Sequence, residues 1–121
     1  MVWNLTADRP VYVQLVEHLQ MAIIVGEFTA GGKLPSVREL AESASVNPNT
    51  MQKALQEMET MGLVNTQRTA GRTITEDVKM IEQLKSECAE KNIADFLENM
   101  HKLGFEKNDI IELIKKVEEE K

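Results

Sequence analysis

Two signals for the start of a helix lie close together in the first half of the chain. Ser36 is a good N-cap, and Glu39 completes a capping box with it. Asn47 can cap a following helix whose first residue is Pro48, because the fixed φ of proline suits the first turn. The helix that begins at Ser36 must therefore be short, ending near Ser43, and a tight turn must follow it. This pattern predicts two successive helices joined by a turn.

Recurring apolar residues extend the pattern on both sides of this turn. Before it, a helix should begin at Pro10, because apolar residues recur there at three- and four-residue steps. These apolar residues are Val11, Leu15, Leu19, Ala22 and Ile23. After the turn, the third helix should end at Gly62, and the runs 63–67 and 72–75 should form a two-stranded hairpin. Helix, helix, turn, helix and hairpin is the order of a winged helix-turn-helix, which we expect over residues 1–75.

The remaining residues, 76–121, predict a helical hairpin. A long helix over 76–103 and a shorter one that carries apolar residues from Ile110 to Val117 each show an apolar stripe. Little else is present to cover these stripes, so burial against a second copy is the simplest solution. We therefore expect a C-terminal dimerisation domain, in a fold that is mainly α with a small β-hairpin. The residues expected at the dimer interface are Ile81, Leu84, Phe96, Leu97, Met100, Ile110, Leu113 and Ile114.

The distribution of charge bears on the kind of ligand. The formal net charge is −6, which by itself argues against nucleic acid. The charge is uneven, however. Residues 1–75 hold six basic and seven acidic side chains (−1), residues 76–121 hold eight and thirteen (−5), and all four arginines lie in the first part. Because arginine suits planar, bidentate contacts with phosphate and guanine, its local placement decides docking, and the first part of the chain is compatible with DNA binding.

The helix that begins at Pro48 carries polar side chains on its leading turn. A helix in the major groove contacts bases with side chains near its N-terminus. Asn and Gln can read adenine bidentately, and Thr can contact a thymine methyl group or a phosphate. The DNA contacts expected from this helix are Asn47, Asn49, Thr50, Gln52 and Lys53. The alternative is that Asn47 only caps the helix and that the other side chains only face solvent.

Two further groups of residues are candidates for contacts with the DNA backbone. Ser36 and Arg38 open the helix that crosses the backbone in this motif, so Arg38 can reach a phosphate or a base edge. The alternative for Arg38 is a surface ion pair with Glu42 at i,i+4. The candidates at the tip of the hairpin, which can sit in or beside the minor groove, are Arg68, Gly71 and Arg72. The alternative for the tip is a solvated turn.

Residues 10–74 resemble the N-terminal domain of the GntR family of bacterial regulators. The matching segments are 10–15 (PVYVQL), 34–41 (LPSVRELA), 46–50 (VNPNT), 57–59 (EME) and 62–64 (GLV). The short helical C-terminal region resembles the YtrA subfamily, in which a two-helix hairpin replaces a larger effector domain. The resemblance implies a dimeric repressor on a palindromic operator, with DNA contacts at Ser36, Arg38, Asn47, Asn49, Thr50, Gln52 and the wing around Gly71. Thr69 and Thr73 depart from the family pattern, which usually has Gly and an aromatic residue there.

Several other classes of protein are disfavoured by the residues present. A single cysteine, Cys88, excludes an internal disulfide and a Cys-rich zinc site. His18 and His101 lie on different predicted helices without an acidic cluster at ligand spacing, so we expect no metal. No nucleophile–base pair or phosphate-binding glycine loop is visible, so we expect neither an enzyme nor a cofactor. No apolar run has the length of a membrane span and no signal peptide is apparent, so we expect a cytoplasmic protein.

Three questions stay open at the level of sequence. A winged helix can also meet another protein, so a protein–protein interaction module or a dimeric adaptor is the alternative to a DNA-binding regulator. Trp3 and Tyr12 could close over the first helix or touch a phosphate. The sequence identifies no small-molecule effector, although a dimer interface could form a cavity for one.

Overall fold

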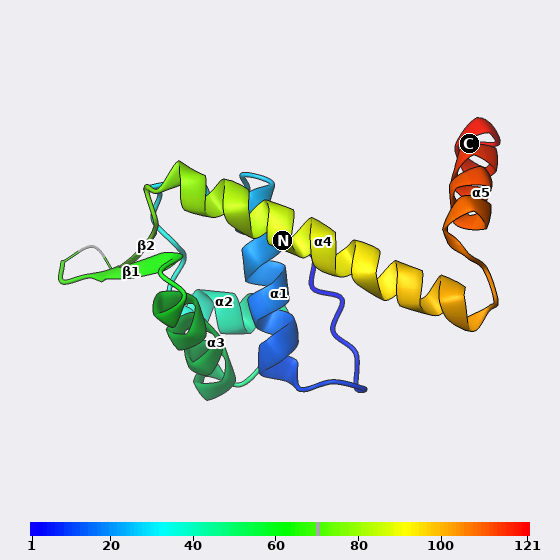
Figure 1. Ribbon diagram of the computed structural model, residues 1–121. Coiled ribbons are helices and arrows are strands. Elements are labelled where there is room, and N and C mark those ends of the chain that lie inside the picture. The colour runs from blue at the N-terminus through cyan, green and yellow to red at the C-terminus, as the bar shows by residue number, and fades with distance from the viewer. Residues whose placement is uncertain (70) are drawn as a thin grey trace. The chain divides into compact units, whose positions relative to one another are not determined.

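The computed structural model describes residues 1–69 and 71–121, so that Ala70, in the predicted turn of the hairpin, lies outside the described residues. The chain forms five helices and one two-stranded sheet within the described ranges (Figure 1). The elements are α1 Val11–Ile24, α2 Val37–Ala44, α3 Pro48–Thr60, β1 Val64–Gln67, β2 Gly71–Ile74, α4 Val78–Lys102 and α5 Lys107–Glu119. This order confirms the predicted fold class, a mainly helical winged helix-turn-helix followed by two C-terminal helices.

The chain divides into two compact units. The first unit, Met1–Lys85, holds α1, α2, α3, the hairpin and the first two turns of α4, and the second unit, Ser86–Lys121, holds the rest of α4 and α5. The functional division expected from the sequence, a DNA-binding domain over residues 1–75 and a dimerisation domain over 76–121, stays a prediction.

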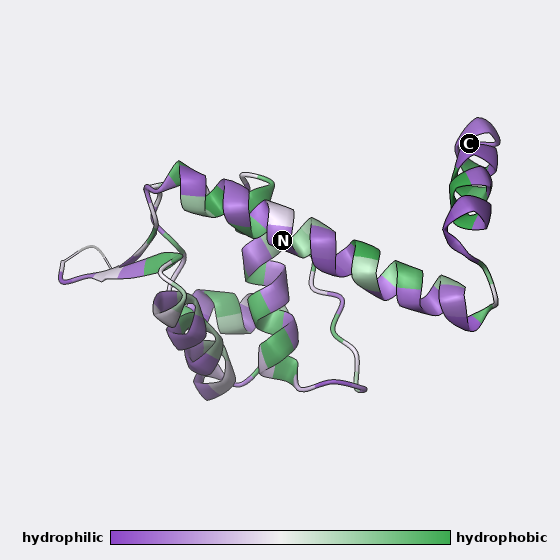
Figure 2. Cartoon of the chain, viewed as in Figure 1, coloured by the Kyte–Doolittle hydropathy of each residue, from purple (hydrophilic) through white to green (hydrophobic). Residues whose placement is uncertain are grey.

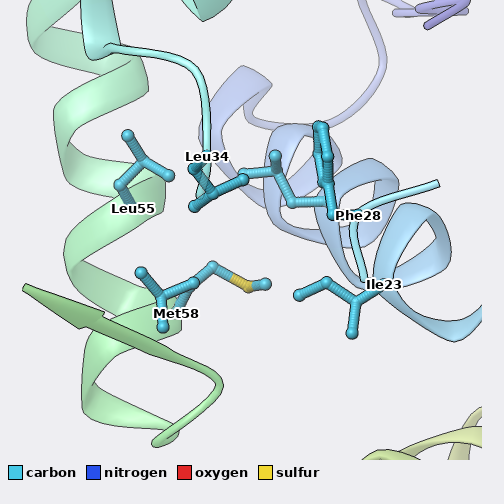
Figure 3. A pocket seen from close by; sticks show the side chains of 7 residues that line it. Ile23, Phe28, Leu34, Leu55 and Met58 are labelled. Carbon is cyan, nitrogen blue, oxygen red and sulfur yellow. The ribbon is translucent and has the colours of Figure 1, made fainter. Parts of the chain in front are cut away.

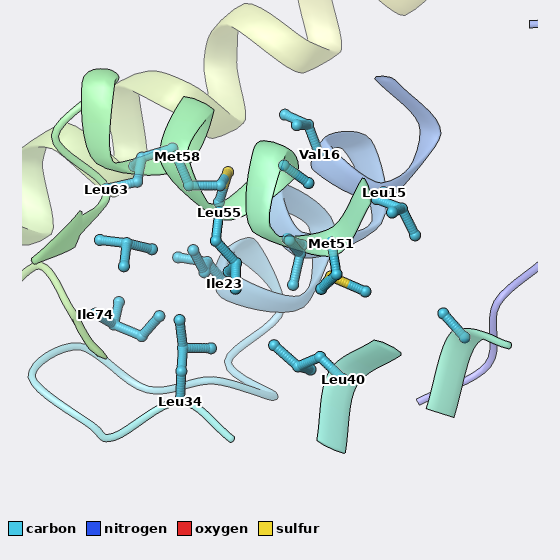
Figure 4. Close-up of a cluster of buried hydrophobic side chains, with 14 of the residues drawn as sticks. Leu15, Val16, Ile23, Leu34, Leu40, Met51, Leu55, Met58, Leu63 and Ile74 are labelled. Atoms are coloured by element: carbon cyan, nitrogen blue, oxygen red, sulfur yellow. The ribbon is translucent and has the colours of Figure 1, made fainter. Parts of the chain in front are cut away.

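The first unit is held together by one apolar core that the three helices and the base of the hairpin share. Its fully buried side chains are Leu15, Leu19, Met51, Leu55, Met58 and Ile74, several of which point toward one another in Figure 4. Burial of each such side chain contributes roughly 1.5–3 kcal/mol. In Figure 3, Ile23, Phe28 and Leu34 face Leu55 and Met58 across a gap that is too small for a water molecule. This gap therefore has no room for water, and the flexible side chain of Met58 helps to fill the irregular space around it.

The starts of α2 and α3 lie where the sequence predicts them, whereas α1 begins one residue later than predicted and α4 begins at Val78 instead of residue 76. Ser36 and Glu39 form the capping box of α2, and Asn47 caps α3, whose first residue is Pro48. Ser45, between these helices, adopts a left-handed conformation with φ +56°, which closes the turn. Pro10 is the N-cap residue of α1 rather than its first helical residue, since α1 begins at Val11.

Residues 1–9 are held against α1 and α2 by hydrogen bonds and a ring contact. The Trp3 Nε1–H donates to the Ser43 hydroxyl at 2.9 Å, and the Trp3 ring meets the His18 ring edge-on with centroids 5.4 Å apart. The buried amide of Gln14 donates to the backbone carbonyls of Thr6 and Arg9 and accepts from the Thr6 N–H at 2.7 Å. Trp3 thus closes over the first two helices.

Replacing Gln14 by leucine should lower the free energy of unfolding by about 2 kcal/mol, because the substitution leaves one backbone donor and two backbone acceptors without their partner. Urea unfolding followed by circular dichroism measures the loss. The matched control is Gln56→Leu, which changes an exposed glutamine on α3. Equal stability of the two variants would show that the Gln14 hydrogen bonds contribute nothing.

The second unit buries very little. Within Ser86–Lys121, all of which is described, Ile110 is the one buried residue, and Gly104 with φ +92° separates α4 from α5. Its large exposed apolar side chains are Ile93, Phe96, Leu103, Phe105, Ile111, Ile114 and Val117. Figure 2 shows hydrophobic and hydrophilic residues on different sides of α5. None of the described helices combines the length and the apolar character that crossing a bilayer requires.

The residues expected at the dimer interface lie in different surroundings. Ile81 and Leu84 are half-buried and pack against the core of the first unit. Ile110 is buried within the second unit, with 2% of its surface exposed. Leu97, Met100 and Leu113 are half-buried, whereas Phe96 and Ile114 are exposed. Among the residues expected at the interface, the two exposed ones therefore belong to the second unit.

Candidate nucleic-acid interface

The leading turn of α3 presents amide side chains to solvent. Asn47 and Asn49 are exposed, whereas Met51 on the opposite side of the helix is fully buried. The Asn47 Oδ1 accepts a hydrogen bond from the Asn49 N–H at 2.8 Å, so this amide oxygen is used as the helix cap. In Figure 2, α3 shows a predominantly hydrophilic side to the viewer. The turn therefore offers donors and acceptors on a rigid helix end.

The next residues of α3 are held more closely by the protein. Thr50 and Gln52 are half-buried, so only part of each residue is open to a ligand. The Lys53 Nζ lies 3.9 Å from the centroid of the Tyr12 ring of α1, a cation–π contact. Tyr12 is thus a residue of this surface that the sequence left open, since its pairing with Lys53 depends on how α1 and α3 pack. It holds the lysine ammonium group at the edge of the recognition helix.

The start of α2 carries a cation beside a well-formed cap. The Ser36 hydroxyl accepts from the Glu39 N–H, and the Glu39 carboxylate accepts from the Ser36 N–H, both at 3.1 Å. The bond from the Ser36 backbone, then the Ser36 side chain and the charge of Lys33, lower the pKa of Glu39. Arg38 is exposed and, within residues 1–69 and 71–121, forms no ion pair with Glu42. Its guanidinium group is available to a ligand.

A groove of about 470 Å³ lies between the start of α2 and the wing. Ser36, Gly71 and Arg72 of the predicted site line it together, with Lys33, Thr66 and Thr69 among their neighbours. Lys33 is a cation that the sequence-based assignment missed. The sequence shows that Lys33 directly precedes the Leu34-Pro35-Ser36 segment, but it does not show that Lys33 lies close to the wing. That closeness follows from a backbone bridge between Lys33 and Thr73. Gly71 has φ +75°, a conformation that a side chain would strain.

The two arginines of the wing differ in their surroundings. Arg68 is exposed and pairs with no carboxylate in the described part of the chain. The Arg72 Nε donates to the Glu59 Oε1 at 2.6 Å, and only 18% of the Arg72 side chain is exposed. The Thr66 hydroxyl donates to the same carboxylate oxygen at 2.7 Å. These bonds, the one from Thr66 first, lower the pKa of Glu59, so Arg72 is neutralised by a partner at neutral pH.

The described residues bring no three His, Cys, Asp or Glu side chains together in a group that could hold a metal ion. The polar groups gathered on this surface are instead amides, hydroxyls and cations at the ends of two helices and on a hairpin. Groups of this kind contact phosphate oxygens and base edges, and a helix-turn-helix places its second helix in the major groove.

Known proteins share both the sequence and the fold of this chain. A family model described as "Bacterial regulatory proteins, gntR family" matches residues 11–74. The uncharacterized HTH-type transcriptional regulator YhcF of Bacillus subtilis is 36% identical over 109 residues, which cover 90% of each chain. The HTH-type transcriptional repressor YtrA of the same organism is 32% identical over 112 residues, covering 92% of this chain and 86% of YtrA.

A solved structure extends the similarity to the whole fold. The GntR family transcriptional regulator from Listeria monocytogenes is 40% identical, covers 93% of this chain and 98% of its own, and superimposes with a TM-score of 0.87. The similarity therefore includes the two C-terminal helices as well as the winged helix. Together with the family match over the first unit, it establishes that the chain belongs to the GntR family, as a non-enzymatic, DNA-binding transcription regulator of the short YhcF and YtrA type.

Proposed function

We propose that the protein is a repressor that binds a palindromic operator as a homodimer, with one α3 helix in each half-site. The observation that carries the proposal is the leading turn of α3, where Asn47 and Asn49 face solvent while Met51 is fully buried. The similarity to a relative named as a repressor, YtrA, supports the direction of regulation. Such a protein works in the cytoplasm, where the chromosome lies.

We assign sequence specificity and general affinity for DNA to different residues of this surface. Asn49 and Gln52 can each bond an adenine bidentately in the major groove. Arg38 and Arg68 have no carboxylate partner within the described residues, so we assign them to phosphate contacts, which fix the orientation of the protein on the duplex. Two recognition helices related by a two-fold axis reach half-sites about 34–36 Å apart. A dimer bound in this way blocks the access of polymerase to the promoter.

The second unit supports the dimer. Within Ser86–Lys121 a single residue, Ile110, is buried, and a helical pair of this size rarely forms a stable core alone. Phe96 and Ile114 expose 41% and 46% of their surface, and burial against the same face of a second copy would cover them. A small-molecule effector is open at the level of this proposal: one hairpin is too small to enclose a ligand, but a dimer interface could form a cavity for one.

The proposal is tested by identifying the genomic DNA fragments that the protein binds. Fragments of the protein's own genome that the full-length chain retains are sequenced, and the enriched fragment is used in a mobility-shift assay with salt near physiological strength. We expect a few enriched fragments that share a palindrome. No enrichment over a fragment of scrambled sequence would contradict a sequence-specific regulator and favour a winged helix that meets another protein.

The Asn49→Ala variant should lose discrimination at one base pair of each half-site, by about 1–3 kcal/mol. The backbone N–H that bonds Asn47 is kept, so the helix cap should survive. Fluorescence titrations with operators changed at single positions measure the effect. The control is Gln56→Ala, another exposed amide on α3, which should keep the preference of the wild type. Unchanged base preference in Asn49→Ala would show that another residue reads that position.

A further inference from the structure

One carboxylate oxygen at the end of α3 holds both strands of the wing. The Glu59 Oε1 accepts from the Thr66 hydroxyl of β1 at 2.7 Å and from the Arg72 Nε of β2 at 2.6 Å. Thr66 and Arg72 face each other across the hairpin as a direct cross-strand pair. Glu59 therefore fastens the wing to the helix whose other end carries Asn49.

Besides the backbone hydrogen bonds between β2 and residues 32–34, the wing has few contacts that fix its direction. Each strand has four residues, and only Val64 and Ile74, at the base, are buried. In β1, the three residues beyond the base are exposed. A two-stranded hairpin is marginally stable at best without packing against another element. Beyond the base of the described strands, the side-chain hydrogen bonds that attach the wing to the rest of the first unit are thus those to Glu59.

Arg72 also connects the wing to the segment that leads into α2. Its backbone carbonyl accepts from the Leu34 N–H at 2.9 Å, two residues before the N-cap of α2. The Arg72 side chain reaches Glu59 on α3. Of the two side chains in this ion pair, Arg72 has 18% of its surface exposed and Glu59 has 31%. In the ion pair between Arg9 and Glu17, by comparison, 48% and 40% of the side-chain surfaces are exposed. A shielded, charge-assisted contact of this kind resists solvent screening better than a surface ion pair.

We propose that Glu59 is a positioning residue for DNA binding, which through Thr66 and Arg72 sets the angle between the wing and the recognition helix and so brings Arg68 to the DNA. The inference rests on the proposed function, since it requires a duplex operator as ligand. Glu59 acts through its partners and does not touch the DNA, because a carboxylate repels phosphate. Arg72 is neutralised by this contact, which leaves Arg68 as the cation that the wing contributes.

The first test compares variants of the full-length protein on the retained operator fragment. Glu59→Gln and the milder Thr66→Val should each weaken binding, Glu59→Gln by about tenfold, the size of one lost wing contact. Removing a carboxylate also reduces general repulsion of DNA, so the matched control is Glu57→Gln, on an exposed residue of the same helix. The control should bind as tightly as the wild type or slightly tighter. Equal affinity of Glu59→Gln and Glu57→Gln would overturn the proposal.

The second test separates positioning from a general loss of stability. In an Arg68→Ala background the wing contact is already absent, so Glu59→Gln should weaken binding less than twofold there. Thermal unfolding of each variant gives the folded fraction at the assay temperature. An equal loss with and without Arg68 would show that Glu59 acts through stability alone and would overturn the inference while leaving the proposed function intact. A wild-type protein without preference for its own fragment would instead overturn the proposed function.

Discussion

The Ile114→Asp variant is expected to convert the proposed dimer into a monomer and to weaken operator binding by about 100-fold or more. Ile114 exposes 46% of its surface in one chain, so the substitution leaves the fold of that chain intact. In a symmetric dimer the change occurs twice, and each copy buries a charge without a partner, which costs several kcal/mol. When one half of a dimer is bound, the second half-site is bound at a high effective concentration, which raises the overall affinity by about 10²–10⁴-fold. A monomer loses this gain in affinity.

Sedimentation or light scattering at several protein concentrations measures the first effect, and a mobility-shift titration on the full palindrome measures the second. The matched control is Asn92→Asp, which adds the same charge at an exposed polar position of α4. The control should stay dimeric and bind normally. An Ile114→Asp variant that remained dimeric would place the interface elsewhere on the chain.

The Arg38→Ala variant is expected to weaken binding about tenfold to every DNA sequence, operator and non-specific alike. The reason is the position of the guanidinium group, which is exposed at the start of α2 and has no carboxylate partner in the described residues. Loss of one phosphate contact removes one released counterion, so the slope of log K against log salt should become shallower by about one.

Titrations at four or more salt concentrations, on operator and scrambled fragments, separate these quantities. Arg9→Ala is the control, because it removes the same charge from the first unit at a side chain already paired with Glu17 at 2.9 Å. The control should change neither the slope nor the ratio of specific to non-specific binding. If Arg38→Ala lost discrimination between the two fragments while keeping the slope, Arg38 would read a base edge instead of a phosphate.

The sequence predicted the elements well because their signals are local. The capping box of Ser36 and Glu39, the cap at Asn47 and the glycines that end helices each act within a few residues. The apolar stripe of α1 follows from spacing only in part. Leu15, Leu19, Ala22 and Ile23 are buried as predicted, whereas Val11 is exposed, and Gln14 and Val16 are buried without having been predicted. In α3 the buried residues, Met51, Ala54, Leu55 and Met58, recur at three- and four-residue steps. The outward position of Asn49 follows from the same stripe, since the buried Met51 fixes the face of the helix.

What the sequence could not provide was the partner of each polar side chain across the fold. Arg68 and Arg72 look equivalent in the chain, yet only Arg72 reaches Glu59, because the hairpin register places it opposite Thr66 beside α3. Lys53 meets the ring of Tyr12 because α1 and α3 pack together.

The sequence by itself determined where helices begin and end, which faces are apolar, and the family, because these depend on neighbours within a turn or two and on a contiguous motif. The tertiary structure decided which charges are free and which are paired, which apolar residues are already covered, as Ile81 and Leu84 are, and how the wing is held. Such pairings join residues that are distant in the chain, and only the docking of helices against a hairpin brings them within bonding distance.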